Sequence, residues 1–276
     1  MIIQNIKLDE KKHRITFELH DKNYCILNAL RIILQTQIKK KIAVPIILEN
    51  NTGIHDENVV KIFNLMNFVQ DKITNFDIKI KCEDEFMPIF MDKYMPKTGM
   101  IVKDHYFHTI KKGQELKLKV AFHEGIPFDN EAFSSVGNIG YRIKSDKDTT
   151  IAGHLFNMEY LESYTPYFLL NEACSIFLKK LENLKIEKDI EMHFDERDVD
   201  ESILGPINFE IHQKYNDVFA SVYRREVDST DIYYKCNSVS RFQYGLDTIK
   251  AKFEAIRDIF AGLDKKTFDK INLESF

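Results

Sequence analysis

The chain has 276 residues, of which 44% are hydrophobic and 30% charged, and its formal net charge at pH 7 is −4. This composition predicts a folded protein with one large domain or two or three smaller ones, and the acidic balance argues against a protein that mainly coats nucleic acid. The cysteines Cys25, Cys82, Cys174 and Cys236 form no C-x-x-C pair, so neither a zinc ribbon nor a disulfide framework is indicated.

The first segment of the chain predicts two strands and a helix. Residues 2–8 and 15–19 alternate between apolar and polar side chains, with a polar turn at residues 9–13 between them. Asp21 or Asn23 is expected to cap the helix that follows. Apolar residues at helical spacing then form a stripe too broad for one small sheet, so we expect a second domain or chain to cover it.

The middle of the chain predicts a mostly β region. Residues 42–48 are typical of a strand broken by Pro45, and residues 50–57 of a loop before a short helix that Asp56 caps. Strand-like alternation recurs between residues 71 and 150, on either side of a loop rich in Met, Pro and Phe at residues 86–100. Residues 137–140, GNIG, predict a turn.

A helix is expected after a strand at residues 156–160. Thr165-Pro166 combines a capping hydroxyl with a proline for the first turn. Apolar residues then follow at alternating spacings of four and three, a pattern typical of a helix packed along another helix.

The last third of the chain repeats the first segment. One constant shift in numbering, which we call the repeat shift, places Phe17 on Phe194 and Asp21 on Asp198 without a gap. The repeat shift also aligns four apolar helix positions, pairing Ile26 with Ile203, Leu27 with Leu204, Leu30 with Ile207 and Leu34 with Ile211. Such repetition indicates two related units in one chain. Strands near residues 218–227 and 232–236 and a long closing helix are expected after it.

Three stretches of the first half carry specific motifs. Asn28-Ala29-Leu30-Arg31 follows the acidic turn, residues 49–57 read ENNTGIHDE, and residues 112–116 and 122–126 read KGQEL and FHEGI. Together they resemble the alpha-like subunits of multisubunit RNA polymerases. This family includes the amino-terminal domain of bacterial alpha, archaeal subunits D and L, and the third and eleventh subunits of eukaryotic polymerase II.

The second half resembles the eleventh-subunit or L type. Residues 203–206, ILGP, stand where that type has T-L-G-N, and proline at position 206 is unusual there. We expect Pro206 to lie in the first turn of the helix, where proline is tolerated. The first half departs too, because Ile32 replaces a second arginine that helps bacterial members to hold a large subunit. Only Cys82 lies in the region where third-subunit relatives carry a zinc cluster, so we predict no zinc.

The resemblance implies an α+β fold in which two alpha-like dimerisation units pack as an internal pseudo-dimer through amphipathic helices. The first unit would span residues 1–45 plus 151–186, a mostly β subdomain would be inserted at 46–150, and the second unit would span 187–276. The residues expected in the internal interface are Ile26, Leu27, Leu30, Ile33, Leu34, Leu170, Phe177, Leu181, Ile203, Leu204, Ile207, Ile211, Ile249, Phe253, Ile256 and Phe260.

The resemblance also implies a function, that of a non-catalytic scaffold subunit of a DNA-dependent RNA polymerase on which the two largest subunits assemble. The candidate contact residues for those subunits are Asn28, Arg31, Asn51, Thr52, Asp56 and Glu57. Small accessory polymerase subunits are further expected partners, a membrane is not, and nucleic acid would be reached only through the complex. Because such fusions occur among large DNA viruses, we expect the cytoplasm or a virion for a viral protein, and otherwise a reducing intracellular compartment.

Two other interpretations remain open. The chain could be an alpha-like fold reused as a regulatory or structural protein outside the polymerase, or an unrelated α+β enzyme. Polymerase catalysis needs clustered aspartates that hold two magnesium ions, and no cluster of that type is recognised. Asp104, His105 and His108 lack a further close metal ligand, so surface or packed histidines are predicted. No cofactor is expected.

Overall fold

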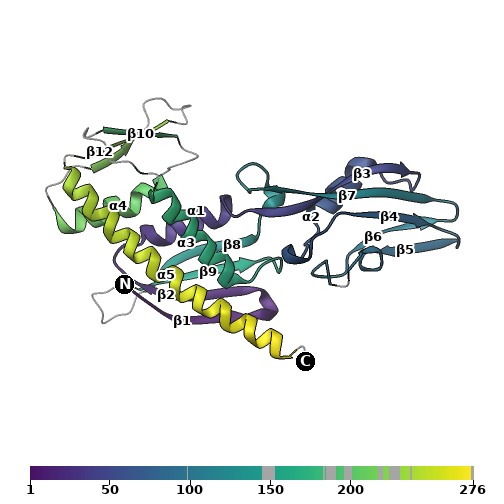
Figure 1. Ribbon diagram of the computed structural model, residues 1–276, viewed down its shortest axis with the longest axis horizontal. Coiled ribbons are helices and arrows are strands. Elements are labelled where there is room, and N and C mark those ends of the chain that lie inside the picture. Colours follow the sequence, from purple (N-terminus) through teal and green to yellow (C-terminus); the bar gives the residue numbers. More distant parts are fainter. Residues whose placement is uncertain are drawn as a thin grey trace. The chain divides into compact units, whose positions relative to one another are not determined.

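The computed structural model describes residues 1–97, 99–144, 153–182, 184, 191–195, 201–216, 220–223, 231–236 and 238–274 (Figure 1). Over these residues the chain is a mixed α+β protein with five α-helices, and its strand ladders are antiparallel. The chain folds into two compact units. Unit 1 comprises Met1–Gln37, Val136–Tyr160 and Thr165–Phe276, and unit 2 comprises Ile38–Ser135 and Leu161–Tyr164.

The first sheet of unit 1 has four strands in the order β1-β2-β9-β8. Their bounds are β1 (Ile2–Asp9), β2 (Arg14–His20), β8 (Val136–Lys144) and β9 (Gly153–Tyr160). Alternation along β2 buries Ile15, Phe17 and Leu19, and the Phe17 ring stacks on Phe156 of β9 with 4.8 Å between ring centres. The strands predicted at residues 2–8, 15–19 and 156–160 are therefore confirmed.

Two helices accompany this sheet, α1 (Cys25–Thr36) and α3 (Pro166–Glu182). The predicted cap of α3 is confirmed, because the Thr165 hydroxyl accepts a hydrogen bond from the backbone N–H of Phe168 at 3.1 Å. The predicted cap of α1 is wrong. Tyr24 occupies the capping position without a side-chain bond, and the Asp21 carboxylate accepts from the backbone N–H of Asn23 at 2.8 Å instead.

The second half of unit 1 repeats the topology of the first half. Its elements are β10 (Glu191–Asp195), α4 (Glu201–Lys214), β11 (Ala220–Tyr223), β12 (Asp231–Cys236) and α5 (Val239–Glu274). The strand order is β10-β12-β11. Once β1 and unit 2 are set aside, the first half runs β2, α1, β8, β9, α3 with the strand order β2-β9-β8. Element order and strand order therefore agree between the halves.

Some expectations for the second half need correction or cannot be placed. Because α4 begins at Glu201, Pro206 lies inside the helix and not in its first turn, and the helix loses one backbone hydrogen bond there. An acidic turn is also expected from Asp195 to Glu201, and its residues 196–200 lie outside the described residues, as do the ends of the strand expected at 218–227. The backbone of Phe194 is described in β10, but its side chain is not.

Unit 2 is β-rich, as expected for the middle of the chain. A three-stranded sheet has the order β3-β7-β4, and a two-stranded ribbon joins β5 to β6. The bounds are β3 (Lys40–Asn50), α2 (Asp56–Leu65), β4 (Phe76–Lys81), β5 (Phe86–Phe90), β6 (Tyr106–Lys111) and β7 (Glu115–Gly125). Helix α2 packs against β3, and one buried core includes Phe63 of α2, Ile78 of β4, Ile89 of β5 and Leu118 of β7.

Four local predictions in the middle of the chain are wrong. Asp56 does not cap α2, because it is the first residue of the helix and His55 occupies the capping position without a side-chain bond. Pro45 does not break its strand but pairs with Val120 in register, because β3 is an edge strand, where a missing N–H can face away from the ladder. The expected loop at residues 86–100 contains β5 and a short 3-10 helix at Met91–Tyr94. Residues 137–140 lie in β8, next to a register shift, and glycines are compatible with such an irregularity.

The unit boundaries also differ from the expected ones. Residues 38–45, expected in the first dimerisation unit, belong to unit 2. Strand β8, inside the range 46–150 expected for the insert, pairs with β9 in unit 1. Among the described residues, no helix combines the length and the apolar character that a membrane crossing requires.

Candidate helix interface between the two halves of unit 1

Four helices of unit 1 pack together, two from each half. Helix α1 contacts α3 of its own half and α4 of the second half, and α5 contacts α4 of its own half and α3 of the first half. Figure 1 shows α3 and α5 running alongside one another. We call this assembly of α1, α3, α4 and α5 the helix interface. Corresponding helices therefore meet across it, α1 with α4 and α3 with α5.

The residues expected in the internal interface are all buried. The set consists of Ile26, Leu27, Leu30, Ile33 and Leu34 of α1, Leu170, Phe177 and Leu181 of α3, Ile203, Leu204, Ile207 and Ile211 of α4, and Ile249, Phe253, Ile256 and Phe260 of α5. Burial of such side chains contributes about 1.5–3 kcal/mol each relative to exposure. The side chains that the helical spacing selected are therefore buried, and their place in a contact between the halves stays a prediction.

Aromatic rings join the two halves at the α3–α5 contact. The rings of Phe177 and Phe253 are stacked with 3.6 Å between their centres and 7° between their planes. Phe260 of α5 meets Phe17 of β2 edge to face at 5.3 Å. The long closing helix therefore packs against both a helix and a strand of the first half.

Two glycines lie where helices approach one another, and one of them leaves no room for a side chain. A Cβ atom added at Gly205 of α4 would lie 4.0 Å from the Cβ of Cys25 in α1. A Cβ added at Gly245 of α5 would lie 2.8 Å from a side-chain carbon of Ile211 and 3.0 Å from the carbonyl oxygen of Ile207. Gly245 therefore has no room for a side chain against α4.

A polar cluster lies within this apolar interface and consists of Asp21, Asn23, Glu210 and Lys252. The Lys252 ammonium is 2.9 Å from the Asp21 carboxylate and 2.7 Å from Oε1 of Glu210. The Asn23 amide donates to the same Glu210 oxygen at 2.7 Å and to the backbone carbonyl of Pro206 at 2.9 Å. Asp21 and Asn23 belong to the first half, and the other residues belong to the second half. The Lys252–Glu210 contact therefore lies within the second half, and the other bonds connect the two halves.

Burial and charge act in opposite directions on the lysine of the polar cluster. Burial by itself lowers the pKa of Lys252, but the hydrogen bonds and charges of Glu210 and Asp21 outweigh it and raise the pKa above its usual value. Asn23 is fully buried and Glu210 is 9% exposed. The amino group of Met1 also lies 3.8 Å from Asp21. The cluster is therefore a compensated set of buried charges.

The pairing within the polar cluster was not anticipated from the sequence, although a signal was present. Under the repeat shift, Glu210 falls on Ile33, so a carboxylate occupies a position that is aliphatic in the first half. Lys252 likewise interrupts the apolar series between Ile249 and Phe253. A charged residue inside an apolar helix stripe indicates a buried partner.

The candidate contact residues for large subunits are divided between the two units. Asn28 and Arg31 lie on α1 in unit 1, half-buried, and the Arg31 guanidinium donates to the side chains of Asn28 and Gln35 on the same helix. The remaining candidates, all in unit 2, are Asn51, Thr52, Asp56 and Glu57.

In the unit 2 loop the candidates do not share one environment. Asn51, Asp56 and Glu57 are exposed, whereas Thr52 is buried. The Thr52 hydroxyl donates to the side chain of Asn50 at 2.7 Å, and the Asn50 amide donates to Asp56 at 2.7 Å. Thr52 therefore shapes the loop, and the exposed residues are the ones a partner can reach.

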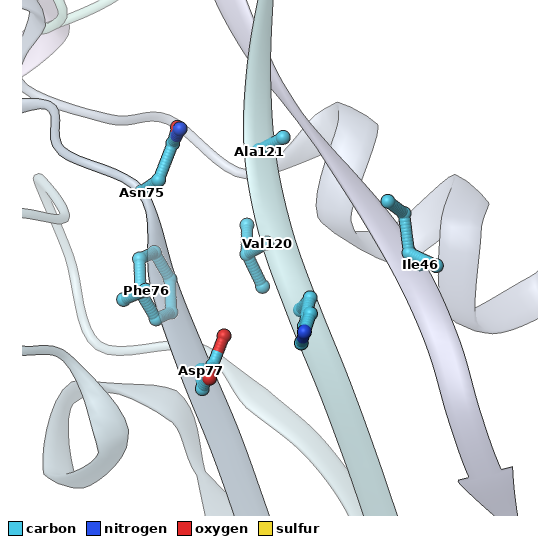
Figure 2. Close-up of a pocket in the computed structure, with 7 residues that line it drawn as sticks. Ile46, Asn75, Phe76, Asp77, Val120 and Ala121 are labelled. Atoms are coloured by element: carbon cyan, nitrogen blue, oxygen red, sulfur yellow. The ribbon is translucent and has the colours of Figure 1, made fainter.

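Figure 2 shows an open pocket over the sheet of unit 2. Its volume is about 490 Å³, and Ile46 of β3, Phe76 and Asp77 of β4, and Lys119 and Val120 of β7 are among its lining residues. Asp77 and Lys119 are register partners on neighbouring strands. Asp77 and Lys119 are the titratable side chains of this lining.

The two histidines considered as metal ligands lie in different elements of the chain. His105 lies in an exposed loop and His108 in β6. Within the described part of the chain, no group of three or more His, Cys, Asp or Glu side chains is arranged to hold a metal ion.

Comparison of the chain with models of known protein families gives no match, and comparison with curated protein sequences gives no match either.

Proposed function

We propose that this protein is a non-catalytic scaffold subunit of a multisubunit DNA-dependent RNA polymerase. Its two halves would be alpha-like units that pair as an internal pseudo-dimer, and unit 2 would be the subdomain inserted in the first of them. The observation that carries the proposal is the repeated topology, β2-α1-β8-β9-α3 in one half and β10-α4-β11-β12-α5 in the other.

The helix interface supports the pseudo-dimer. In a symmetric dimer the same surface patch is used on both partners, and here α1 meets its counterpart α4 while α3 meets its counterpart α5. The apolar pairs related by the repeat shift, such as Leu30 with Ile207, are buried on both sides. The motif at residues 28–31, which resembles that of the alpha-like subunits, lies on α1 at this interface.

The mechanism that we propose is assembly. The helix interface provides a preformed rigid platform, and by resemblance the first half would face the second-largest polymerase subunit and the second half the largest. Joining both units in one chain makes their pairing intramolecular, so that it no longer depends on the concentrations of two separate proteins. Small accessory subunits would complete the complex.

The test is affinity purification of the tagged full-length chain from the cells or particles that produce it. We expect two polypeptides much larger than this 32.5 kDa chain to co-purify in equal amounts, together with DNA-dependent RNA synthesis in the eluate. Isolation of the chain without such partners, or with partners unrelated to transcription, would favour the alternative of a regulatory or structural protein.

A surface variant connects that result to the proposed contact. Arg31→Glu should leave folding intact, because Arg31 is half-buried and bonds to neighbours on its own helix. It should reduce recovery of a large partner by about tenfold or more, which corresponds to about 1.4 kcal/mol or more. Lys22→Glu, an exposed charge reversal just before α1, is the matched control and should leave recovery unchanged. Equal recovery with both variants would remove Arg31 from the contact.

A further inference from the structure

We propose that the outer edge of β4 is a docking site for an extended acidic segment of a partner protein, which would pair with β4 as an additional strand. The residues whose backbone forms this edge are Asp77, Lys79 and Lys81, and we call them the β4 edge. The proposal goes beyond the scaffold role and does not depend on it, because all of its evidence lies within unit 2.

The backbone of the β4 edge has no strand partner within the described part of the chain. In the strand order β3-β7-β4, only one side of β4 pairs with a neighbour. Alternate residues of an antiparallel strand bond to the same neighbour, and directly after the ladder the backbone N–H of Cys82 donates to the carbonyl of Gln114 at 2.9 Å. The even-numbered residues of β4 therefore face β7, and the N–H and C=O groups of the β4 edge point away from it.

The opposite edge of the same sheet is closed. The Gln70 side chain accepts from the backbone N–H of Lys41 at 2.9 Å and donates to its carbonyl at 3.1 Å, and Pro45 of β3 has no N–H to offer. Proteins commonly use proline, covering groups and charge to prevent further pairing at a sheet edge. On the β4 edge charge is the protecting feature, and lysines that repel a basic strand attract an acidic one.

Regular pairing distinguishes β4 from several other edge strands. The ladders that contain β1, β8 and β5 each carry a register shift, and such bulges hinder the addition of a strand. All six residues of β4 pair with β7 without a shift. The β4 edge is therefore a continuous template for a further strand.

The charges on the outward face favour an acidic occupant. Lys117 of β7 is paired with Glu49 and Glu115 at 2.6 and 3.1 Å. Lys79 lies 3.9 Å from Glu115, and 71% of its side chain is exposed. Lys81 is exposed and, among the described residues, forms no ion pair. Because Lys79 and Lys81 are alternate residues on one face, a strand beside them would place two of its own alternate side chains opposite them, and carboxylates there would complete the pairing.

The open pocket adjoins the other end of the β4 edge. Phe76 and Asp77 of β4 line it together with Ile46 of β3, and Figure 2 shows the strand that carries Val120 between them. A carboxylate opposite Asp77 would be repelled, whereas an apolar side chain in that place would adjoin the pocket. The segment that fits the β4 edge therefore carries one apolar and two acidic side chains at alternate positions.

The test is an NMR titration of the full chain with the blocked peptide acetyl-TLVEVEVLT-amide, a palindrome that presents this pattern in either strand direction. Pairing should shift the backbone amide signals of Asp77, Lys79 and Lys81 and slow their exchange with solvent by about tenfold or more, because each N–H gains an acceptor. The amides of Ile78 and Ile80 already face β7 and are the internal control, so their exchange should change by less than about twofold.

Two altered peptides separate backbone pairing from attraction between charges. Glutamine in place of both glutamates should weaken binding by about threefold or more, because the pairs with Lys79 and Lys81 are lost. N-methylation of both glutamates and of the valine between them keeps the charges but removes the N–H groups that would bond to β4. That peptide should not slow exchange at the β4 edge.

A variant of the chain tests the same edge from the other side. Lys79→Pro repeats on β4 what Pro45 does on β3, because the N–H that it removes faces away from β7. It should weaken binding by about tenfold or more, whereas Lys79→Thr, which loses the charge and keeps the N–H, should weaken it by about threefold or less. If Lys79→Pro does not fold, the comparison of the methylated and unmethylated peptides decides the question.

Four results would overturn the proposal. The first is unchanged exchange at the β4 edge with the peptide at millimolar concentration, and the second is equal binding of a peptide with lysine in place of both glutamates. The third is equal binding of the N-methylated peptide, which would show attraction between charges only. The fourth is slowed exchange of the same amides when the protein concentration alone is raised, because a second copy of the chain would then be the occupant.

Discussion

The stacked pair Phe177–Phe253 allows the contact between the two halves to be measured as an energy. Phe177 comes from α3 and Phe253 from α5, both fully buried, with 3.6 Å between ring centres. Replacing either by alanine would cost about 3–5 kcal/mol, a large part of the about 5–15 kcal/mol that stabilises a typical domain. Leucine is the better substitution, because it keeps most of the volume and removes the ring.

A double-mutant cycle with Phe177→Leu and Phe253→Leu should give a coupling free energy of about 0.5–1.5 kcal/mol beyond the loss of buried area. Chemical unfolding followed by circular dichroism in the helical band reports mainly on unit 1, because α2 is the single α-helix in the described part of unit 2.

The control cycle combines Phe177→Leu with Phe242→Leu. Phe242 is equally buried on α5, but it lies eleven residues, or about 16 Å, along the helix from Phe253. Its effect should therefore add to that of Phe177 within about 0.3–0.5 kcal/mol. A coupling of zero for Phe177 and Phe253, or one no larger than in the control cycle, would refute the contact between α3 and α5 on which the pairing of the halves depends.

Two further predictions concern a glycine and a buried lysine. Gly245→Ala should lower the unfolding free energy, because overpacking against Ile207 and Ile211 costs about 1–3 kcal/mol. Gly262→Ala on the same helix has open space around the added methyl group and should raise the unfolding free energy by up to about 1 kcal/mol. Denaturation curves of the two variants with equal midpoints would contradict the close approach of α4 and α5. Burial lowers the pKa of Lys40 in the folded chain to about 8. Between this value and the pKa of an unfolded lysine, near 10.4, the unfolded chain binds more protons than the folded chain, so the unfolding free energy rises with pH. Relative to Lys40→Met, the wild type should gain up to about 3 kcal/mol between about pH 7.5 and 10, and a difference that does not change with pH would show that Lys40 is solvated.

The parts of the fold that repeat along the sequence could be predicted from it. Leu30 and Ile207 lie at corresponding positions of two helices with 3.6-residue periodicity, and both are buried as the pattern predicts. Thr165 could be identified as a cap because its signal lies within three residues of the group it bonds. Local periodicity therefore sufficed where the controlling contacts are close in the chain.

Other features depend on neighbours that the local sequence does not contain. Pro45 is accepted because β3 is at the edge of its sheet, and that position is set by β7, far along the chain. The bond between Asn23 and Glu210 joins residues 187 positions apart. Each polar residue is ordinary for a turn or a helix surface, and their pairing is decided by how the helices pack. For the same reason the burial of Thr52 could not be separated in advance from the exposure of Asp56.

The proposed pairing of the two halves depends on the contact of α1 with α4, and a disulfide tests it directly. A Cβ added at Gly205 would lie 4.0 Å from that of Cys25, within the range of about 3.5–4.5 Å typical of disulfides. Burial raises the pKa of the Cys25 thiol, so mild oxidation should be carried out at alkaline pH. Gly262→Cys, with open space around the added Cβ, is the matched control.

The deciding measurement is the mass spectrum of disulfide-linked peptides from oxidised Gly205→Cys protein. The account predicts that Cys25 becomes linked to the new cysteine within a single chain, while Gly262→Cys forms no link to Cys25. Failure of the Gly205→Cys variant to form this link, or a link that forms only between chains, would contradict the pairing of the two halves within one molecule.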